Sequence, residues 1–286
     1  MSSIVVFGAS GQLGQCLKDF TEKNGITSVY FPSETEANIM NDAALEKIFE
    51  TYNPAFCINC AAYTAVDKAE DDQELALRIN KTGVENICRH CVTNGSALIH
   101  ISTDFIFKGD VPIPRNEEDV TQPINVYGQT KLDGELAVKE ILGKYFIIRT
   151  GWLYSEYGNN FVKTMLKLGA ERDELKIIAD QTGTPTYAMD LAACIMHIIS
   201  ANSRAYGVYH YSNEGVASWY DFAKAIFDLS GTKVKALPVK TSEYVTKAVR
   251  PSYSVMDKSK IKNTFNMDIP YWRDSLATCI DRLKTK

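Results

Sequence analysis

The sequence lacks the features that mark membrane, secreted and nucleic-acid-binding proteins. No uninterrupted apolar run approaches the roughly 18–20 residues that a membrane-spanning helix needs. Residues 1–4 enter a short apolar segment without a charged leader or a cleavage site, so we expect no secretion signal and a cytoplasmic protein. The 31 basic residues are outnumbered by 35 acidic ones, and the net charge of −4 offers no basic field to nucleic acid.

The seven cysteines are odd in number and poorly spaced for a zinc site. The pairs Cys57/Cys60 and Cys88/Cys91 each have two intervening residues, as zinc ligands often do. The first pair falls in a strand-like run, where residues three apart point to opposite faces. The 27 residues between the pairs also exceed the usual gap of about 15–20. We therefore expect buried core thiols, no disulfide framework and no metal.

Short apolar runs alternate with longer amphipathic stretches in the first half of the chain. Strands are predicted at residues 4–7, 28–31, 55–59, 97–102 and 145–149. Helices are predicted up to about residue 23 and at 41–52, 74–94 and 127–142. Continuous apolar strands between helices are typical of a parallel sheet covered on both faces. The expected fold class is therefore α/β, a Rossmann-type doubly wound sheet.

The pattern loosens beyond residue 149 and predicts a second, smaller unit. Helical periodicity appears at residues 161–170, 190–200, 219–229 and 272–283, and strand-like runs appear at 176–178 and 208–211. We expect a Rossmann domain over residues 1–150, to which about 180–212 returns. Residues 151–179 and 213–286 would form a smaller C-terminal lobe.

A glycine-rich turn follows the first strand and opens the first helix. Its glycines, Gly8, Gly11 and Gly14, allow a tight turn and a close approach of the backbone to a pyrophosphate. The helix N-terminus adds free N–H donors and a favourable dipole, so the turn predicts a dinucleotide site. About 20 residues further on, Glu34 is placed to bind the ribose hydroxyls of NAD, unless it is a solvated loop residue. Ser33 is able to bond a 2′-phosphate, so NADPH and NADH both remain open, with a slight preference for NADH.

Tyr127 and Lys131 stand four residues apart at a predicted helix start and share one helical face. A nearby Lys⁺ is expected to lower the phenol pKa from about 10 and to make tyrosine a usable acid or base. Such a pair is common on ordinary helices. Here, however, Thr103 stands at the end of the strand that precedes the helix of Tyr127, which favours a functional interpretation of the pair. Ligands of doubly wound sheets bind beyond the carboxyl ends of the strands. We therefore expect the dinucleotide turn, the Thr103 hydroxyl and the Tyr/Lys pair to meet at one edge of the sheet. Together these groups are suited to hydride transfer to a carbonyl.

These motifs resemble the extended short-chain dehydrogenase/reductase superfamily and, within it, the dTDP-4-dehydrorhamnose reductase family. The resemblance spans nearly the whole chain, and its most specific part is the run from Thr64 to Glu70. It is carried by residues 59–70, 102–107, 125–131, 149–154, 158–162, 180–186, 250–251 and 254–257.

The resemblance implies a reaction and a role for individual residues. The reaction is reduction of the C4 keto group of dTDP-4-dehydro-L-rhamnose with NADPH or NADH, in dTDP-rhamnose biosynthesis. Tyr127 would donate the proton, Lys131 would hold the nicotinamide ribose, and Thr103 would bond the reacting oxygen. Asp104 and Trp152 would line the sugar site of the smaller, substrate-binding lobe. Dinucleotide contacts are implied for Gly8, Gly11, Gln12, Leu13, Gly14, Asn38, Ile39, Ala61, Ala62, Tyr63 and Thr64.

Some members of this resemblance also have structural interpretations. Arg250 either binds the nucleotide diphosphate, since arginine suits phosphate oxygens, or forms an ion pair. Trp152 is either a residue of the sugar site or a core residue at the junction of the two lobes. Asp67, Lys68 and Glu70 are either ligand-binding residues or the salt-bridged start of a helix. The resemblance implies a monomer or a homodimer.

Two departures bear on metal binding and cofactor choice. Some family members hold a metal at a dimer contact with glutamates, and the matching positions here are Cys16 and Met189. We therefore expect no metal. Asn38 stands where the family has aspartate near the adenine, which leaves the cofactor preference open.

Three other functions remain as alternatives. A dehydratase usually has Thr-Asp-Glu after the strand, whereas this chain has Phe105 after Asp104, which disfavours water elimination. A nucleotide-sugar 4-epimerase uses the same hydride chemistry, and co-purified NAD would favour it. A non-catalytic subunit similar to the regulatory subunit of methionine adenosyltransferase would show no turnover of NAD(P)H without its partner.

Overall fold

The main sheet of the computed structural model, which describes residues 3–285, is parallel throughout. Among these residues it has six strands in the order β10-β5-β4-β3-β1-β2. The strands are β1 (Ile4–Phe7), β2 (Val29–Tyr30), β3 (Phe56–Asn59), β4 (Ala97–Thr103), β5 (Tyr145–Thr150) and β10 (Gly207–His210). This arrangement confirms the predicted Rossmann-type doubly wound sheet.

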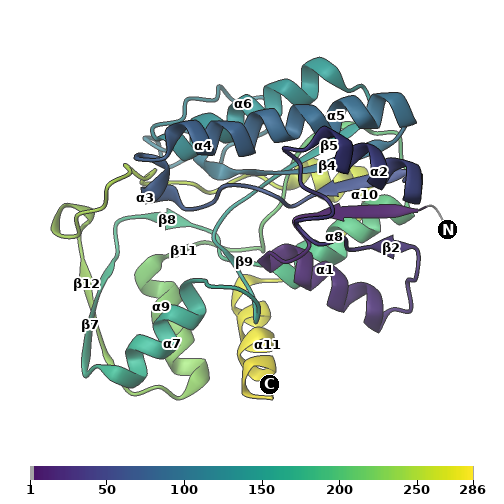
Figure 1. Cartoon of the computed structure of the whole chain (residues 1–286). Coiled ribbons are helices and arrows are strands. Elements are labelled where there is room, and N and C mark those ends of the chain that lie inside the picture. The colour runs from purple at the N-terminus through teal and green to yellow at the C-terminus, as the bar shows by residue number, and fades with distance from the viewer. Residues whose placement is uncertain (1–2, 286) are drawn as a thin grey trace.

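Helices cover both faces of this sheet, as Figure 1 shows. Successive residues of β1 point to opposite faces, so Ile4 and Val6 join one core cluster and Val5 and Phe7 join the other. All four are buried because neither face meets water. One face carries α1 (Gln12–Lys23), α8 (Ala188–Ser200) and α10 (Ser259–Phe265). The other carries α2 (Asp42–Tyr52), α5 (Gly83–Asn94) and α6 (Val126–Ile141).

The predicted helix at 74–94 is interrupted by a wider turn. It comprises α4 (Gln73–Leu77), a π-helical turn at Arg78–Thr82 and α5. π-Helical turns inside helices are often found at functional sites. Here the turn carries the fully buried Asn80.

The cysteines lie in both core layers. Cys57 belongs to the cluster under α2 and α5, whereas Cys60 packs against the opposite cluster, as the alternation along a strand predicts. The thiols of Cys57 and Cys91 form a hydrogen bond within the first of these clusters. Residues 3–285 contain no disulfide.

A smaller lobe with its own core follows β5. Its helices are α7 (Phe161–Glu171), α9 (Trp219–Ser230) and α11 (Trp272–Lys284), which share one apolar cluster. A parallel pair of strands, β7 (Glu174–Ile178) and β12 (Lys235–Val239), borders the lobe in the lower left of Figure 1. Two short ribbons join it to the sheet region, β6 (Leu153–Tyr154) with β9 (Thr186–Tyr187) and β8 (Thr182–Gly183) with β11 (Ala217–Ser218).

The chain crosses between the sheet and the lobe more than once. After α7 and β7 it returns through α8 and β10, and β10 pairs with β5 at the edge of the sheet, with Val208 opposite Ile147. It then enters the lobe again at α9. Within residues 3–285 no helix is long and apolar enough to cross a membrane.

Candidate active site

The glycine turn between β1 and α1 is shaped by contacts that exclude side chains. Gly8 has a φ of 74°, and a Cβ atom there would lie 2.5 Å from the backbone nitrogen of Ala61. A Cβ atom on Gly14 would lie 2.5 Å from the carbonyl oxygen of Gly8. Gly11 is the N-cap of α1 and has no side chain with which to cap the first N–H groups of the helix. These N–H groups are therefore available to an anionic ligand.

A cavity of about 340 Å³ adjoins this turn, at the point where β1 separates β2 from β3. Ligands of such sheets bind at this switch in strand order. The cavity is lined by Gly8, Gly11, Glu34, Ala37, Asn38, Ile39, Met40, Cys60, Ala61, Ala62 and Ile79. It thus brings together six of the residues expected to contact a dinucleotide, whereas Tyr63, Thr64, Tyr127 and Lys131 lie outside its lining. A pyrophosphate fits the N-terminus of α1, and an adenosine fits the apolar wall at Ile39 and Ile79.

Two predicted cofactor residues have side chains that serve the fold. Leu13 is buried in the core under α1. The Gln12 amide donates to the carbonyl oxygen of Leu153 at 3.2 Å and accepts from the side chain of Asn160 at 2.9 Å. Gln12 therefore ties the first helix to the smaller lobe, and the side chain of Leu13 is not available to a dinucleotide.

Glu34 lies in the loop that follows β2, and its carboxylate lines one end of the cavity. The Ser10 hydroxyl donates a hydrogen bond to this carboxylate, which ties the glycine turn to the loop after β2. A carboxylate suits the hydroxyls of an unphosphorylated ribose and repels a 2′-phosphate.

Asn80 clamps the loop that follows β3. Its side-chain oxygen accepts from the Tyr63 amide at 2.8 Å, and its side-chain nitrogen donates to the Tyr63 carbonyl at 3.2 Å and to the Thr130 hydroxyl at 3.0 Å. The loop of Ala61, Ala62 and Tyr63 is thereby fixed to α6, whereas Thr64 is exposed. Sequence analysis missed Asn80, because an asparagine inside a predicted helix gave no signal.

Tyr127 lies in the first turn of α6, which is anchored at several points. The Asn125 side chain caps the Gly128 amide at 2.8 Å, and the Glu70 carboxylate accepts from the Val126 amide at 2.9 Å. A Cβ atom on Gly128 would lie 2.3 Å from the carbonyl oxygen of Phe105, so the helix start packs directly against the segment after β4. The Tyr127 phenol forms a hydrogen bond with Thr103, and the two predicted catalytic residues therefore meet.

The protonation of the Tyr/Lys pair differs from the expectation. Burial raises the pKa of Tyr127 to about 12, the Thr103 hydrogen bond opposes this shift, and Asp104 adds to it. Burial also lowers the pKa of Lys131 to about 8, and its ammonium donates to the Ile101 carbonyl at 2.6 Å. The expectation that Lys131 lowers the pKa of Tyr127 is therefore wrong for this structure, because burial dominates the shift. The phenol is protonated at neutral pH and suits the role of an acid.

Asp104 is buried beside this pair. It accepts a hydrogen bond from the Thr103 hydroxyl at 3.1 Å and is hydrogen-bonded to Ser254 of the C-terminal region. Burial raises the pKa of Asp104 to about 6, and these hydrogen bonds limit the shift. A Cβ atom on Gly151 would lie 2.6 Å from the Asp104 carboxyl group, so glycine is required there.

Trp152 follows directly with an unusual backbone. Its φ of 51° is a left-handed conformation that costs a bulky residue about 1–3 kcal/mol. Its indole stacks on that of Trp219, with ring centroids 3.5 Å apart and planes 5° apart. Sequence analysis did not find Trp219 and noted Ser254 only within the run 254–257, without a role, because the pattern in this part of the chain predicts only helices and strands.

Arg250 is held in an ion pair. Its guanidinium donates to both carboxylate oxygens of Asp67, at 3.1 and 2.5 Å, and to the carbonyl oxygen of Ala248 at 3.1 Å. Lys68 pairs with Asp72 at 3.2 Å. Asp67, Lys68 and Glu70 thus have the structural contacts that were the alternative to ligand binding, and α3 (Val66–Ala69) is joined to the segment around residue 250.

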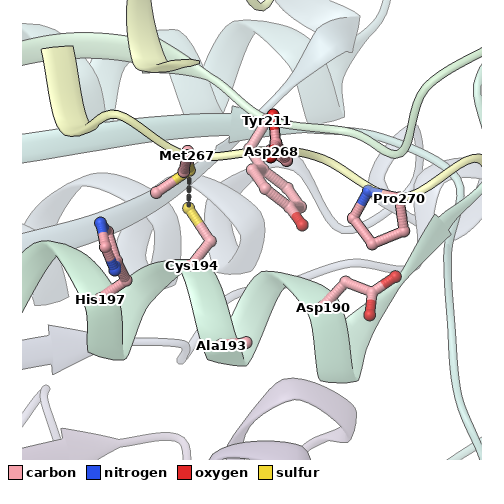
Figure 2. A pocket seen from close by; sticks show the side chains of 8 residues that line it. All are labelled: Asp190, Ala193, Cys194, His197, Tyr211, Met267, Asp268 and Pro270. Carbon is pink, nitrogen blue, oxygen red and sulfur yellow. Dashed lines mark hydrogen bonds between the residues drawn. The ribbon is translucent and has the colours of Figure 1, made fainter. Parts of the chain in front are cut away.

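A separate cavity of about 270 Å³ lies between α8 and the segment around Met267 (Figure 2). The Cys194 thiol points to the Met267 sulfur at 3.8 Å, and Asp190, His197, Tyr211 and other residues complete the wall. None of the predicted site residues lines it, so it is distinct from the candidate active site.

The positions considered for a metal carry apolar or thiol side chains. Cys16 is buried, and burial raises its pKa to about 12, while Met189 packs between two core clusters. Over residues 3–285 no three or more histidine, cysteine, aspartate or glutamate side chains gather as metal ligands.

Known proteins resemble this chain along its whole length. A family model described as the RmlD substrate binding domain matches residues 1–285. A curated dTDP-4-dehydrorhamnose reductase from Aggregatibacter actinomycetemcomitans is 37% identical over 286 residues, covering 96% of this chain and 97% of that protein. A crystal structure of a dTDP-4-dehydrorhamnose reductase from Clostridium acetobutylicum has a TM-score of 0.93 and 41% identity, covering 99% of both chains. The Bacillus anthracis enzyme of the same name, in complex with NADP, has a TM-score of 0.94 and 40% identity, covering 98% of this chain and 99% of that one.

Proposed function

The chain belongs to the dTDP-4-dehydrorhamnose reductase family, and on this premise we propose that it reduces dTDP-4-dehydro-L-rhamnose to dTDP-L-rhamnose with NADPH or NADH. The observation that carries the proposal is the hydrogen bond between Tyr127 and Thr103, at the same carboxyl edge of the parallel sheet as the glycine turn. The proposal places the reaction in the biosynthesis of dTDP-rhamnose.

The reaction divides between the cofactor and three side chains. A bound nicotinamide cofactor supplies the hydride that arrives at C4 of the sugar. Tyr127, protonated because its pKa lies near 12, gives its proton to the C4 oxygen, which becomes the hydroxyl of the product. Thr103 orients the phenol and bonds the same oxygen. Lys131 holds the nicotinamide ribose from the next turn of α6.

The remaining site residues have proposed binding roles. Asp104 and Trp152 line the sugar site: Asp104 follows Thr103 at the end of β4, and Trp152 lies two residues beyond Thr150, which pairs with Thr103 at the end of β5. Arg250 binds the diphosphate of the nucleotide sugar, and this contact competes with the ion pair between Arg250 and Asp67. The dinucleotide lies along the cavity from Asn38 and Ile39, past the backbone of the glycine turn, to the loop of residues 61–64.

We also propose the division of the chain and its setting. Residues 1–150 with about 180–212 bind the cofactor, and 151–179 with 213–286 bind the substrate. The protein works in the cytoplasm as a monomer or homodimer and, at a net charge of −4, does not bind nucleic acid. Light scattering on the purified protein measures the oligomeric state, and a trimer or larger assembly would contradict this part.

The test follows oxidation of NADPH and NADH with dTDP-4-dehydro-L-rhamnose generated in situ. We expect turnover by the wild type and a loss of about 10²–10⁴-fold in kcat for Tyr127→Phe, with unchanged dinucleotide affinity. Tyr145→Phe, at the amino end of β5, is the matched control and should remain fully active. A folded wild type that binds dinucleotide but oxidises neither cofactor would overturn the proposal, and retained NAD would then indicate an epimerase.

A further inference from the structure

The backbone of Trp152 needs an external restraint. The other non-glycine residues with a positive φ between residues 3 and 285 are asparagines: Asn53, Asn202 and Asn266. Asparagine tolerates this conformation because its short polar side chain bonds locally, whereas a tryptophan has no such compensation. Contacts elsewhere in the molecule must therefore hold Trp152 in place.

The smaller lobe and strand β8 together supply these contacts as a slot for the indole. The ribbon of β8 and β11 sets Gly183 opposite Ala217, and Trp219 follows immediately as the first residue of α9. The Trp219 ring covers one face of Trp152 at 3.5 Å. A Cβ atom on Gly183 would lie 2.6 Å from Cε2 of Trp152, so a larger residue at this position would displace the Trp152 ring.

Trp219 is itself fixed from behind. The Phe161 ring lies 4.7 Å from it at 51°, on the side of α7. The start of α9 is closed by a capping box, in which the Ser218 hydroxyl accepts from the Asp221 amide at 3.0 Å and the Asp221 carboxylate accepts from the Ser218 amide at 2.9 Å. The slot is therefore a preformed part of the lobe, because its wall depends on a helix start and a ribbon.

The slot is connected to the reacting groups through the backbone. The Trp152 carbonyl accepts from the Thr186 amide at 3.1 Å, and the preceding residue, Gly151, lies against the Asp104 carboxyl group. Asp104 in turn accepts from the Thr103 hydroxyl. A shift of the indole would therefore move the backbone that borders the sugar site.

We propose that Trp219 is a positioning residue for sugar recognition, which acts by holding the Trp152 indole in the slot. The inference rests on the proposed function, in which Trp152 lines the sugar site. It assigns α9 a specific contribution: this helix sets the position of Trp152, which lies two residues beyond the end of β5. Binding of the nucleotide part should not depend on Trp219.

The test compares the dissociation constants of dTDP-L-rhamnose and of dTDP by calorimetry. For Trp219→Leu we expect dTDP-L-rhamnose to bind about tenfold more weakly, the scale of a lost aromatic pair. The affinity for dTDP should stay within about twofold, and Trp219→Phe, which keeps a stacking ring, should recover most of the loss. The circular dichroism couplet of two stacked indoles should disappear in Trp219→Phe and in Trp152→Phe alike.

Distinct outcomes separate this inference from the proposed function. A wild type that reduces the keto sugar, with an unchanged affinity of Trp219→Leu for dTDP-L-rhamnose, would overturn the inference alone. Equal weakening of dTDP and dTDP-L-rhamnose would also overturn it, because that result indicates general damage to the lobe. A folded wild type that binds neither ligand and reduces nothing would overturn the proposed function, and the inference with it.

Discussion

The guanidinium of Arg250 and the carboxylate of Asp67 form a two-point ion pair between α3 and the C-terminal region. The hydrogen bond from Arg250 lowers the pKa of Asp67, against the opposing effect of burial. A second ion pair, Lys247 with Asp71, and a hydrogen bond of 2.8 Å from the Asn125 side chain to the Val249 carbonyl attach the same segment. The segment of residues 247–250 therefore crosses from the smaller lobe to the start of the catalytic helix.

This relationship permits a test of the role proposed for Arg250. We expect Arg250→Gln to weaken dTDP-L-rhamnose binding about tenfold, because a phosphate contact is lost, and Asp67→Asn to weaken it less than about threefold. Calorimetric titration of both variants and of the double variant provides the comparison. Equal effects of the two single substitutions, with no further loss in the double variant, would assign Arg250 to the ion pair alone.

Thr103 should matter through its hydroxyl. Thr103→Val removes the hydrogen bonds to Tyr127 and Asp104, and we expect kcat to fall about 10²-fold, as for the loss of one oriented donor. Thr103→Ser keeps the hydroxyl and should retain most of the activity. Steady-state kinetics with both substrates saturating measure the effect, and near-normal turnover by the valine variant would contradict it.

Asp104 should make the protein less stable as the pH rises. Its carboxyl group ionises near pH 6 in the folded protein and near 3.9 in an unfolded chain, so the folded state holds this proton more tightly between these values. The stabilisation is complete below about pH 3.9, is lost as the pH rises through about 6, and amounts to about 3 kcal/mol. Asp104→Asn should therefore gain stability relative to wild type between pH 4.5 and 7, as measured by urea unfolding. A constant difference between the two proteins would show that Asp104 ionises normally.

Glu34 should discriminate between the two cofactors. Removing its charge in Glu34→Gln should relieve repulsion of a 2′-phosphate, and we expect the ratio of kcat/KM for NADPH over NADH to rise about tenfold. Glu50→Gln is the matched control, because Glu50 is an exposed residue of α2 that does not line the cavity. Equal changes in both variants would show that the effect is one of general charge.

The buried ion pair of Arg149 and Glu135 should be sensitive to removal of one partner. Two guanidinium nitrogens of Arg149 donate to the Glu135 carboxylate, the shortest at 2.8 Å, and neither residue is more than 1% exposed. Arg149→Met leaves that carboxylate with only the longer contact to Lys139, at 3.9 Å, and we expect a loss of about 3–5 kcal/mol of unfolding free energy. The double variant Arg149→Met/Glu135→Met should recover much of it in urea unfolding. Equal stabilities of the single and double variants would contradict this account.

The regular part of the fold was predictable from sequence because its signals are local and repeated. The strand expected at residues 208–211 appears as β10 at Gly207–His210, and the helix expected at 127–142 appears as α6 at Val126–Ile141. By contrast, β12 was not predicted, since it contains Pro238 and lies outside the main sheet, where apolar runs are not needed. The short helix α10 was also missed, because seven residues give too few turns for periodicity.

The site divides in the same way. Gly8, Gly14, Thr103 and Tyr127 occupy positions that a strand end or a helix start marks in the sequence. Asn80, Ser254 and Trp219 reach the site only through the tertiary fold: a π-helical turn, a C-terminal segment and the first residue of a lobe helix. No spacing rule connects such residues, because the contacts join parts of the chain that are far apart.

The return of the chain through β10 has a consequence for synthesis. The edge of β5 pairs with β10 only after residues 207–210 have left the ribosome. Helix α10, which covers the sheet face that also carries α1 and α8, is synthesised later still. Until then the nascent protein presents an unpaired strand edge and uncovered apolar residues, the combination that favours self-association. The sheet and its helical cover are therefore complete only after residue 265 has been synthesised, and a chain truncated by a nonsense mutation before residue 207 would keep the edge of β5 exposed.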